Sequence, residues 1–341
     1  MRSALYTGNG AIVVTDGEAA PPGPGQVRLD VAYTGICGTD LHVLHGDMDH
    51  RVTVPQPIGH EMSGRVAEIG PGVEGWSAGQ PVTVMPLRSC GSCPACAAGH
   101  GHVCHRLDFV GIDSPGSMQE SWTVPADLLV ALPAGLSLRH AALVEPTAVA
   151  VHDVRRAGLV AGERAVVVGG GPVGVLIALV ARAVRADVLL VEPDAHRRGV
   201  AAGLGLRVLD PGDDIAAAVD AWTAGAGADV SFEVSGVAQG VATGVEVLAT
   251  RGRLVLVAIH GTPRPLDLHR FFWRELSLIG ARVYTRDDVE TAVDLVDRGE
   301  VDAGPLISHV VALSDAPRAF ATLAAGHGAM KVLVECGGEA R

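Results

Sequence analysis

Short apolar runs that alternate with helical stretches organise the second half of the chain. Residues 165–168 and 188–191 have the pattern of buried strands, and an apolar helix between them extends to about residue 184. Three further apolar runs lie at residues 230–234, 254–259 and 277–280, with a helix expected over residues 239–248. Strands that alternate with helices in this way predict an α/β fold with a doubly wound parallel sheet.

The first part of the chain has a different pattern. Residues 1–130 are rich in glycine and proline and contain short valine-rich segments such as QVRLDVAYTG, SGRVAEIG and QPVTVMP. Glycine and proline punctuate strands at this spacing, so the composition predicts an irregular β-barrel. The chain has no internal repeat, low-complexity tract or long linker.

Composition narrows the class of protein. With 341 residues, 48% of them hydrophobic, the chain is about two domains long and can bury a large core. Its 26 basic and 38 acidic side chains give a net charge of −12, which argues against nucleic acid or an anionic membrane as the main partner. The segment MRSALYTGNG lacks the apolar stretch of a signal peptide, and glycines interrupt the most apolar run, so we expect a soluble cytoplasmic protein. Lysine occurs once, at Lys331, a compositional bias to which the sequence assigns no mechanism.

Four of the six cysteines lie within fifteen residues in a C-x2-C-x2-C-x7-C arrangement, at Cys90, Cys93, Cys96 and Cys104. Four thiolates at this spacing fit a tetrahedral metal, because a reducing cytoplasm disfavours disulfides. An iron–sulfur cluster is the competing interpretation, and we favour zinc. Four cysteines leave no coordination position for water, so we expect a structural site, with the neighbouring His100, His102 and His105 as solvated loop residues.

A second set of metal ligands is spread over three segments. Cys37 lies in GICGTDLH, His60 and Glu61 lie in PIGHEMSG, and Glu145 lies in LVEPTAVAVH. A thiolate, an imidazole and carboxylates make a mixed zinc shell with room for a substrate oxygen, which is typical of a catalytic zinc. Each residue alone is a weak indication, but the glycines around them permit the tight turns that a converging site needs.

A glycine-rich turn with the motif G-x-G-x-x-G follows the strand at residues 165–168, at Gly169, Gly171 and Gly174. A strand before the glycines, a helix after them and an acid about twenty residues later indicate a Rossmann unit, which holds the pyrophosphate at the helix N-terminus. The acid is Glu192, which favours NAD over NADP because a carboxylate accepts bonds from the ribose hydroxyls and repels a 2′-phosphate. Arg197 and Arg198 oppose this preference, because an arginine just past the acid accommodates that phosphate.

The chain resembles the zinc-dependent medium-chain alcohol and polyol dehydrogenases over essentially its whole length, in the ordered motifs GICGTDLH, GHEMSG, the four-cysteine lobe, EPTAVAVH and VVVGGGPVG. The resemblance implies a GroES-like β-barrel catalytic domain at residues 1–149 and 286–341, with a structural zinc lobe at about residues 88–106. A Rossmann NAD-binding domain is expected at residues 150–285. The resemblance also implies two zinc ions per subunit, and a homodimer or homotetramer joined around residues 276–284.

Single residues acquire roles from the same resemblance. Cys37 and His60 match zinc ligands of that family. The third ligand is a carboxylate, as in the sorbitol, butanediol and threonine dehydrogenase branch, and the choice between Glu61 and Glu145 stays open. Asp40 matches an acid that orients the zinc-binding histidine.

The resemblance further implies a proton path and a cofactor site. Thr39 matches the hydroxyl that receives the substrate proton, and His42 matches the histidine that passes it to solvent, with His45 as a nearby alternative. Arg282 aligns with an arginine near substrate and cofactor in polyol enzymes. The residues expected to bind the cofactor are Gly169, Gly171, Pro172, Val173, Gly174, Glu192, Arg197, Ser235 and Ile259.

These features predict a zinc-dependent oxidoreductase that transfers hydride reversibly between NAD and a secondary alcohol, vicinal diol or polyol, giving the ketone. A primary alcohol or aldehyde dehydrogenase of the same family is the alternative, and a non-catalytic NAD-binding sensor is the alternative from another class. Val43, Leu44 and Met118 indicate either a less polar substrate pocket or simple packing. The first interpretation favours a vicinal diol or hydroxy-ketone over a six-carbon polyol.

Overall fold

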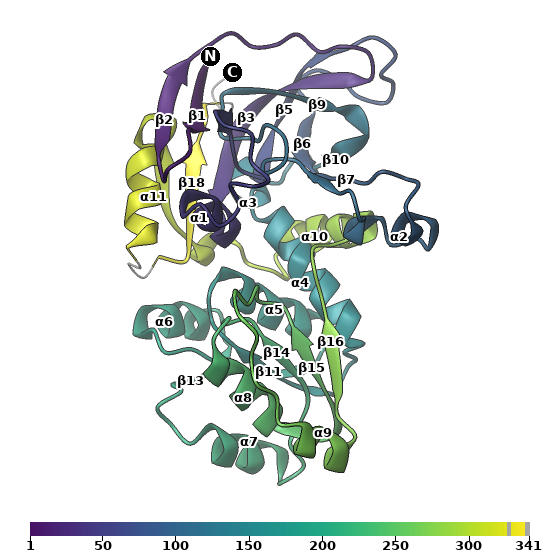
Figure 1. The fold of residues 1–341 in the computed structure, drawn as a ribbon, viewed down its shortest axis with the longest axis vertical. Helices are drawn as coiled ribbons and strands as arrows, with labels where there is room; N and C mark the ends of the chain where they lie inside the picture. The colour runs from purple at the N-terminus through teal and green to yellow at the C-terminus, as the bar shows by residue number, and fades with distance from the viewer. Residues whose placement is uncertain (326–328, 338–341) are drawn as a thin grey trace. The chain divides into compact units, whose positions relative to one another are not determined.

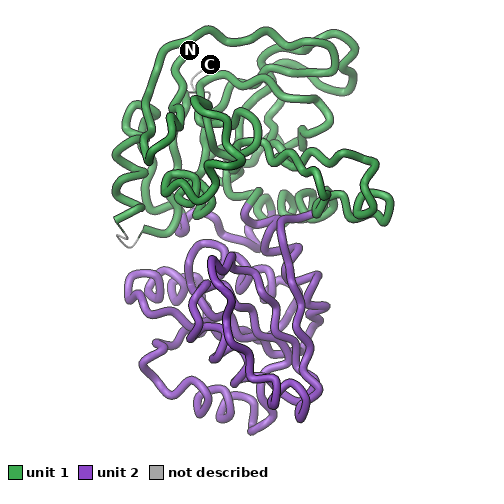
Figure 2. Tube along the Cα trace, in the orientation of Figure 1, with its two compact units in different colours: residues 1–145, 285–297, 307–341 green, residues 146–284, 298–306 purple. Residues whose placement is uncertain are grey.

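The computed structural model describes residues 1–325 and 329–337 and divides the chain into two compact units (Figures 1 and 2). Unit 1 comprises Met1–Glu145, Thr285–Asp297 and Ile307–Arg341, and unit 2 comprises Pro146–Tyr284 and Arg298–Leu306. Residues 146–149 and 298–306, which were expected in the first domain, belong to unit 2, and Thr285, which was expected in the second domain, belongs to unit 1. The helix α4 (Val144–Ala157) runs without a break past the expected boundary, and the second segment buries Val301 and Leu306.

A seven-stranded sheet forms the centre of unit 1. Its order is β10-β6-β5-β3-β18-β17, with β9 also paired to β3, and only the pair β17–β18 is parallel. The strands are β3 (Gln26–Ile36), β5 (Glu61–Ile69), β6 (Pro81–Val84), β9 (Ser121–Pro125), β10 (Leu129–Ala131), β17 (Ile307–Ala312) and β18 (Lys331–Glu335). Burial alternates along the first part of β3, so Val27, Leu29 and Val31 point into the core.

Smaller elements complete unit 1. β1 (Arg2–Tyr6) pairs with β2 (Ile12–Asp16) and β4 (Gln56–Pro57), and β7 (Leu87–Arg88) pairs with β8 (Asp108–Phe109). The helices are α1 (Gly38–Leu44), α2 (Pro94–Ala97), α3 (Leu138–Ala141), α10 (Arg286–Asp297) and α11 (Ala316–Ala324), with 3-10 turns at Gly101–Val103, Ala126–Leu128 and Leu313–Asp315. The short strands agree with the β-rich character expected of residues 1–130.

Unit 2 is built on a six-stranded sheet in the order β13-β12-β11-β14-β15-β16, in which every neighbouring pair is parallel, as predicted. The strands are β11 (Arg164–Val168), β12 (Asp187–Val191), β13 (Arg207–Leu209), β14 (Ala228–Glu233), β15 (Leu248–Leu256) and β16 (Ser277–Gly280). The helices are α5 (Pro172–Ala183), α6 (Ala195–Gly203), α7 (Ile215–Thr223), α8 (Ala238–Glu246) and α9 (Leu268–Arg274), with a 3-10 turn at Gly304–Leu306. The order reverses between β11 and β14, and parallel sheets bind ligands beyond the strand ends at such a point. Within the described ranges, no helix has the length and apolar character needed to span a bilayer.

Candidate active site and cofactor site

Two neighbouring strands of unit 1 bring Cys37, His60 and Glu61 together. Cys37 follows β3 and caps the N-terminus of α1, while His60 directly precedes Glu61, the first residue of β5. The strands are antiparallel, and their register pairs Gly35 with Glu61. One ligand atom from each of Cys37, His60 and Glu61 lies within 4.8 Å of the others, a donor set that fits a zinc ion.

Asp40 is a buried neighbour of Cys37 and His60 in this cluster. The backbone N–H of Cys37 donates to Asp40 Oδ2 at 2.9 Å, and Asp40 Oδ1 lies 3.6 Å from His60 Nδ1. Those last two atoms are buried and have no hydrogen-bond partner among the described residues. Burial opposes the charge on His60, but Asp40 and Cys37 outweigh it and raise the pKa of His60 to about 10. The imidazole is therefore held in a strongly negative environment, which also favours a metal cation.

Lys331, the first residue of β18, contacts the same cluster from the other side of β3. Its Nζ lies 2.7 Å from both carboxylate oxygens of Glu61, and both side chains are buried. Burial disfavours the ammonium charge, but the carboxylate of Glu61 outweighs it and raises the pKa of Lys331. Sequence reasoning missed this residue, although its being the only lysine of the chain was an available signal.

Glu145 is close to the cluster without joining it. It lies in the first turn of α4, is 5% exposed, and its charge contributes to the raised pKa of both His60 and Lys331. It is not among the three residues whose ligand atoms lie within 4.8 Å of one another. The structure thus places both candidate carboxylates near Cys37 and His60, with Glu61 the nearer, and the choice of direct ligand stays a prediction.

The expected proton-transfer residues lie on α1. Thr39 Oγ1 is 3.8 Å from Cys37 Sγ, so the hydroxyl is beside the ligand cluster. His42 is half exposed, and its Nδ1 lies 2.9 Å from Asp47 Oδ2. A proton on Nδ1 would be held by this carboxylate, which leaves Nε2 to exchange a proton with its surroundings.

The four-cysteine lobe is assembled around α2. The sulfurs of Cys90, Cys93, Cys96 and Cys104 lie within 4.8 Å of one another. Backbone N–H groups of Cys90 and Arg106 donate to Cys104 Sγ, each at 3.3 Å. The backbone N–H of Ser92 and the guanidinium of Arg106 lower the pKa of Cys90 to about 5. Thiolates stabilised in this way fit a tetrahedral metal, and the neighbouring histidines are not members of the group.

The glycine-rich turn of unit 2 has the geometry of a dinucleotide site. Gly169 has φ +109, which favours glycine, and Gly171 caps the N-terminus of α5. A Cβ on Gly174 would lie 1.8 Å from the carbonyl oxygen of Gly169, so helix and turn approach more closely than any other residue allows. The first turn of α5 begins with Pro172, which has no N–H, and Val173, whose backbone N–H is one that a helix N-terminus can offer to a pyrophosphate.

Glu192 ends β12 beside this turn. Its buried carboxylate accepts the backbone N–H of Gly170 at 2.6 Å and that of Asp194 at 2.8 Å. The guanidinium of Arg198 donates to the carbonyl oxygens of Glu192 and Pro193 and forms an ion pair with Asp210. Arg197 Nε has no hydrogen-bond partner in the described part of the chain, and its guanidinium lies near Gly171.

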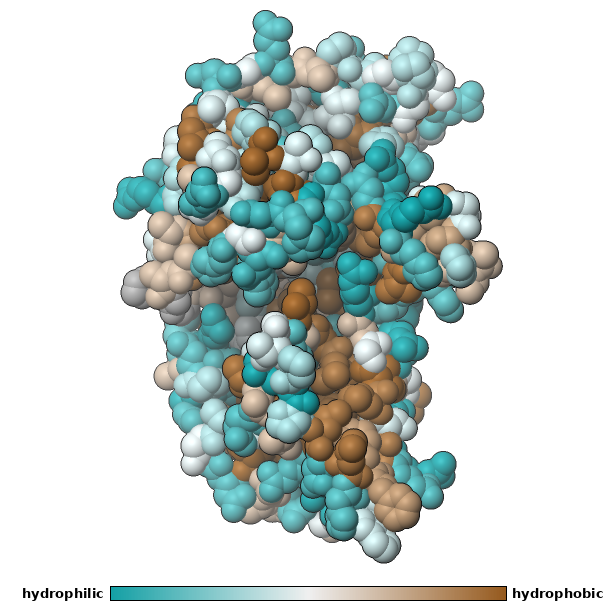
Figure 3. Space-filling model, in the orientation of Figure 1, coloured by the Kyte–Doolittle hydropathy of each residue, from teal (hydrophilic) through white to brown (hydrophobic). Residues whose placement is uncertain are grey.

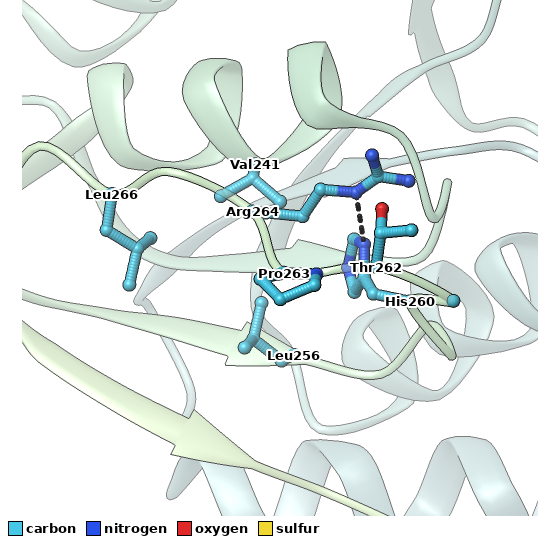
Figure 4. A pocket seen from close by; sticks show the side chains of 8 residues that line it. Val241, Leu256, His260, Thr262, Pro263, Arg264 and Leu266 are labelled. Carbon is cyan, nitrogen blue, oxygen red and sulfur yellow. Dashed lines mark hydrogen bonds between the residues drawn. The ribbon is translucent and has the colours of Figure 1, made fainter.

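The loops after β14 and β15 meet at Glu233, which sequence reasoning missed. Its carboxylate accepts the hydroxyl of Ser235 at 2.5 Å and lies 2.8 Å from His260 Nε2. Arg264 donates to His260 Nδ1 at 3.3 Å, and Figure 4 shows the two side chains facing each other. They border a pocket of about 390 Å³ lined by Val241, Leu256, His260, Gly261, Thr262, Pro263, Arg264 and Leu266. Ile259, which directly precedes His260 in the chain, is 64% exposed.

Four other residues singled out from the sequence lie away from the ligand cluster or are packed in the core. Val43 and Met118 have no exposed surface and Leu44 is 8% exposed, so all three pack in the core of unit 1. Arg282 is exposed and belongs to unit 2, whereas the ligand cluster belongs to unit 1. Its role near substrate stays a prediction.

Comparisons with known proteins show which family this chain resembles. The family model for the alcohol dehydrogenase GroES-like domain matches residues 23–134, and the family model for zinc-binding dehydrogenase matches residues 172–298. The chain is 53% identical over 340 residues to the 2-dehydro-3-deoxy-L-galactonate 5-dehydrogenase of Pseudoalteromonas atlantica, which covers 99% of this chain and 100% of that protein. The first family-model match includes the ligand cluster at Cys37, and the 340-residue alignment also covers the glycine-rich turn.

Two solved structures share the fold. The 2R,3R-butanediol dehydrogenase from Bacillus subtilis aligns with a TM-score of 0.90 and 31% identity, covering 98% of this chain and 99% of that chain. A zinc-binding dehydrogenase from Sinorhizobium meliloti 1021, solved with bound NADP, aligns with a TM-score of 0.92 and 31% identity over 98% of both chains. The similarity therefore extends over nearly the whole of each chain.

Proposed function

Because this chain belongs to the zinc-dependent medium-chain alcohol and polyol dehydrogenase family, we propose that it oxidises a secondary hydroxyl of a six-carbon sugar acid to the ketone, with NAD. Family membership makes it an oxidoreductase of CH–OH donors that uses zinc and a nicotinamide cofactor. The observation that supports the sugar acid is the 53% identity to a 2-dehydro-3-deoxy-L-galactonate 5-dehydrogenase. The burial of Val43 and Met118 removes the argument for a less polar pocket suited to a small diol.

Cys37 and His60, with Glu145 or Glu61, would hold the catalytic zinc, and the four-cysteine lobe would hold a second zinc. The catalytic zinc supplies a Lewis acid that lowers the pKa of the substrate hydroxyl. Asp40, whose buried Oδ1 lies 3.6 Å from His60 Nδ1, would orient the ring of His60. The mixed donor set suits this task, because one thiolate leaves more positive charge on the metal than four thiolates do.

Thr39 and His42 would carry the proton away. The Thr39 hydroxyl lies beside Cys37, where it can accept the proton that the substrate hydroxyl loses. Asp47 Oδ2 lies 2.9 Å from His42 Nδ1, so Nε2 is the ring atom that can pass the proton to solvent. NAD supplies the hydride acceptor.

The preference for NAD rests on Glu192 and on the engagement of Arg198. The Glu192 carboxylate lies at the turn that would receive the adenosine ribose, where it repels a 2′-phosphate. Arg198 already contacts two carbonyls and Asp210, which leaves Arg197 to contact the cofactor. Because one similar structure was solved with bound NADP, the test must compare NAD with NADP.

We also propose a homodimer or homotetramer joined through residues 276–284, in the cytoplasm. Leu278 on the edge strand β16 is 44% exposed, and Phe272 and Trp273 on α9 are 76% and 68% exposed. Figure 3 shows hydrophobic surface gathered over the part of unit 2 that holds β16 and α9. An apolar edge strand is a template for pairing with a second copy. The unpaired thiols suit a reducing compartment.

The test is the initial rate of reduced-cofactor formation with NAD and with NADP, across sugar acids that include 2-dehydro-3-deoxy-L-galactonate, sugar alcohols, vicinal diols and primary alcohols. We expect NAD-dependent turnover with the highest kcat/KM for a sugar acid. A higher kcat/KM for butanediol would overturn the substrate class, and activity restricted to primary alcohols would support the alternative dehydrogenase. Binding of NAD without turnover of any donor would indicate a sensor.

A matched pair of cysteine variants tests the zinc assignment. Cys37→Ser should lose at least about a hundredfold in kcat, because it removes a ligand of the proposed catalytic zinc. Cys336→Ala is the control, since Cys336 is buried in the same unit and belongs to neither metal group. Equal turnover by the two variants would contradict the mechanism.

A further inference from the structure

Glu233 lies at the carboxyl end of β14 as a fully buried carboxylate with four donors around it. Its Oε1 accepts the backbone N–H of Ser235 at 2.9 Å, the hydroxyl of Ser235 at 2.5 Å and the backbone N–H of Gly236 at 3.0 Å. Its Oε2 lies 2.8 Å from His260 Nε2. A Cβ on Gly240 of α8 would lie 2.8 Å from Oε1, so the helix encloses the carboxylate closely. Glu233 is therefore a fixed point to which the loops after β14 and β15 are both attached.

Arg264 determines which nitrogen of the imidazole carries the proton. Its Nε donates to His260 Nδ1 at 3.3 Å, as Figure 4 shows, and its Nη2 donates to the Gly236 carbonyl at 3.2 Å. Because a guanidinium only donates, Nδ1 must accept this bond, and Nε2 carries the proton that is shared with Glu233. The hydrogen bonds therefore run in one direction, from Arg264 through His260 to Glu233.

Ile259 lies between two attachments of the loop after β15. The carbonyl oxygen of Glu233 accepts the backbone N–H groups of Val257 and Ala258 at 3.0 and 3.1 Å, where the chain leaves the sheet. His260 then contacts the side chain of the same glutamate. The residue between them, Ile259, is 64% exposed. Backbone and side chain of Glu233 together determine where this exposed residue lies.

The position of the two loops in the sheet indicates which half of a dinucleotide they meet. A Rossmann sheet has two mononucleotide-binding halves, one on each side of the point where the strand order reverses. Glu192 follows β12 in one half, and the proposed function assigns the adenosine ribose to it. β14 and β15 belong to the other half, so their loops are left for the nicotinamide nucleotide.

We propose that His260 is a positioning residue that, through its bond to Glu233, holds the loop at Ile259 in the conformation that receives the nicotinamide half of the cofactor. The inference rests on the proposed use of NAD. A loop that is held before the cofactor arrives loses less conformational freedom on binding, so its attachment raises the affinity. Without His260, the bonds from Ser235 and Gly236 to Glu233 would still hold the loop after β14. The effect is therefore confined to the loop after β15.

Two substitutions of His260 test the proposal. The amide nitrogen of His260→Gln can take the place of Nε2 and donate to Glu233, whereas the shorter side chain of His260→Asn reaches only the position of Nδ1. His260→Asn should weaken the binding of NADH about tenfold and that of AMP less than about twofold, because AMP fills only the adenosine half. His260→Gln should bind both ligands like the natural protein. Calorimetry measures both affinities, and Thr262→Ala is the control, since Thr262 is exposed beside the same pocket.

A loss of NADH affinity that is confined to His260→Asn supports the proposal, because a merely structural role would weaken NADH and AMP together. Unchanged NADH affinity in His260→Asn would overturn it, as would an equal loss for the two ligands. If this variant does not fold, Arg264→Ala decides, since Arg264 is exposed and its loss removes the bond that orients the imidazole. We expect Arg264→Ala to weaken NADH about threefold and to leave AMP unchanged, and unchanged NADH affinity would again overturn the proposal. A natural protein that binds neither NADH nor AMP would instead refute the proposed cofactor.

Discussion

His60 is a buried base that holds its proton until a cation displaces it. Because the pKa of its imidazole is raised to about 10, the ring is protonated at neutral pH before a metal binds, and metal binding must release that proton. We therefore predict that zinc affinity of the Cys37 site rises with pH, by about tenfold per unit between pH 6 and 8. Calorimetry in buffers of different ionisation enthalpy measures the released protons directly.

A histidine outside the cluster provides the control for this pH dependence. His105 is exposed in the loop of the four-cysteine lobe, so His105→Ala should leave the proton release unchanged. An affinity that is constant between pH 6 and 8 would show that His60 is neutral before the metal arrives.

Residue types in ordered motifs were enough to predict which side chains cluster around Cys37. Cys37, His60 and Glu61 are carried by short segments, and the structure brings their ligand atoms together. Lys331 could not be found in the same way, because its partner lies 270 residues earlier and meets it only across β3. A long-range ion pair of this kind depends on strand register, which a motif does not contain.

Glycines at the turn between β11 and α5 set the distance between helix and sheet. A Cβ on Gly174 would lie 1.8 Å from the Gly169 carbonyl oxygen, and this oxygen is backbone that can move aside only if the turn itself shifts. Gly174→Ala should therefore lower the free energy of unfolding by about 1–3 kcal/mol and weaken NAD binding. Chemical denaturation and a fluorescence titration with NADH measure the two effects.

The matched substitution lies on the next helix of the same unit. Gly199 in α6 has ordinary helical φ, and a Cβ there would meet nothing within 4 Å. Gly199→Ala should stabilise the protein by about 0.5–1 kcal/mol and leave NAD binding unchanged. A similar loss in both variants would mean that helix propensity, not the close approach at Gly169, governs this region.

In unit 2, most strands and helices could be predicted from the sequence, but a short edge strand and the start of β15 could not. The run predicted at residues 277–280 is β16 (Ser277–Gly280), and the helix expected to about residue 184 is α5 (Pro172–Ala183). β13 (Arg207–Leu209) was not predicted, because it is a three-residue edge strand without a fully buried position. β15 begins at Leu248, six residues before the predicted start, because ATRG is polar and exposed enough to look like a loop.

At the scale of the whole molecule, the apolar edge of unit 2 makes self-association testable. Leu278→Lys places a charge on the exposed edge strand β16, and we expect it to shift the sedimentation coefficient from that of a dimer or tetramer toward that of a monomer. Val160→Lys is the control, since Val160 is 58% exposed on unit 2 outside this strand. A natural protein that sediments as a monomer would contradict the proposed assembly.

The position of β18 has a consequence for biosynthesis. Unit 2 needs only residues 146–306 and, during translation, can fold as soon as these have left the ribosome. The central sheet of unit 1 is incomplete until residues 331–335 emerge, because β3 must wait for β18 as its neighbour. Glu61 is synthesised early but meets its ammonium partner only at that moment. A nascent chain that stalls before residue 331 would therefore expose an unpaired strand edge beside exposed metal ligands, which makes it a substrate for chaperones and proteases.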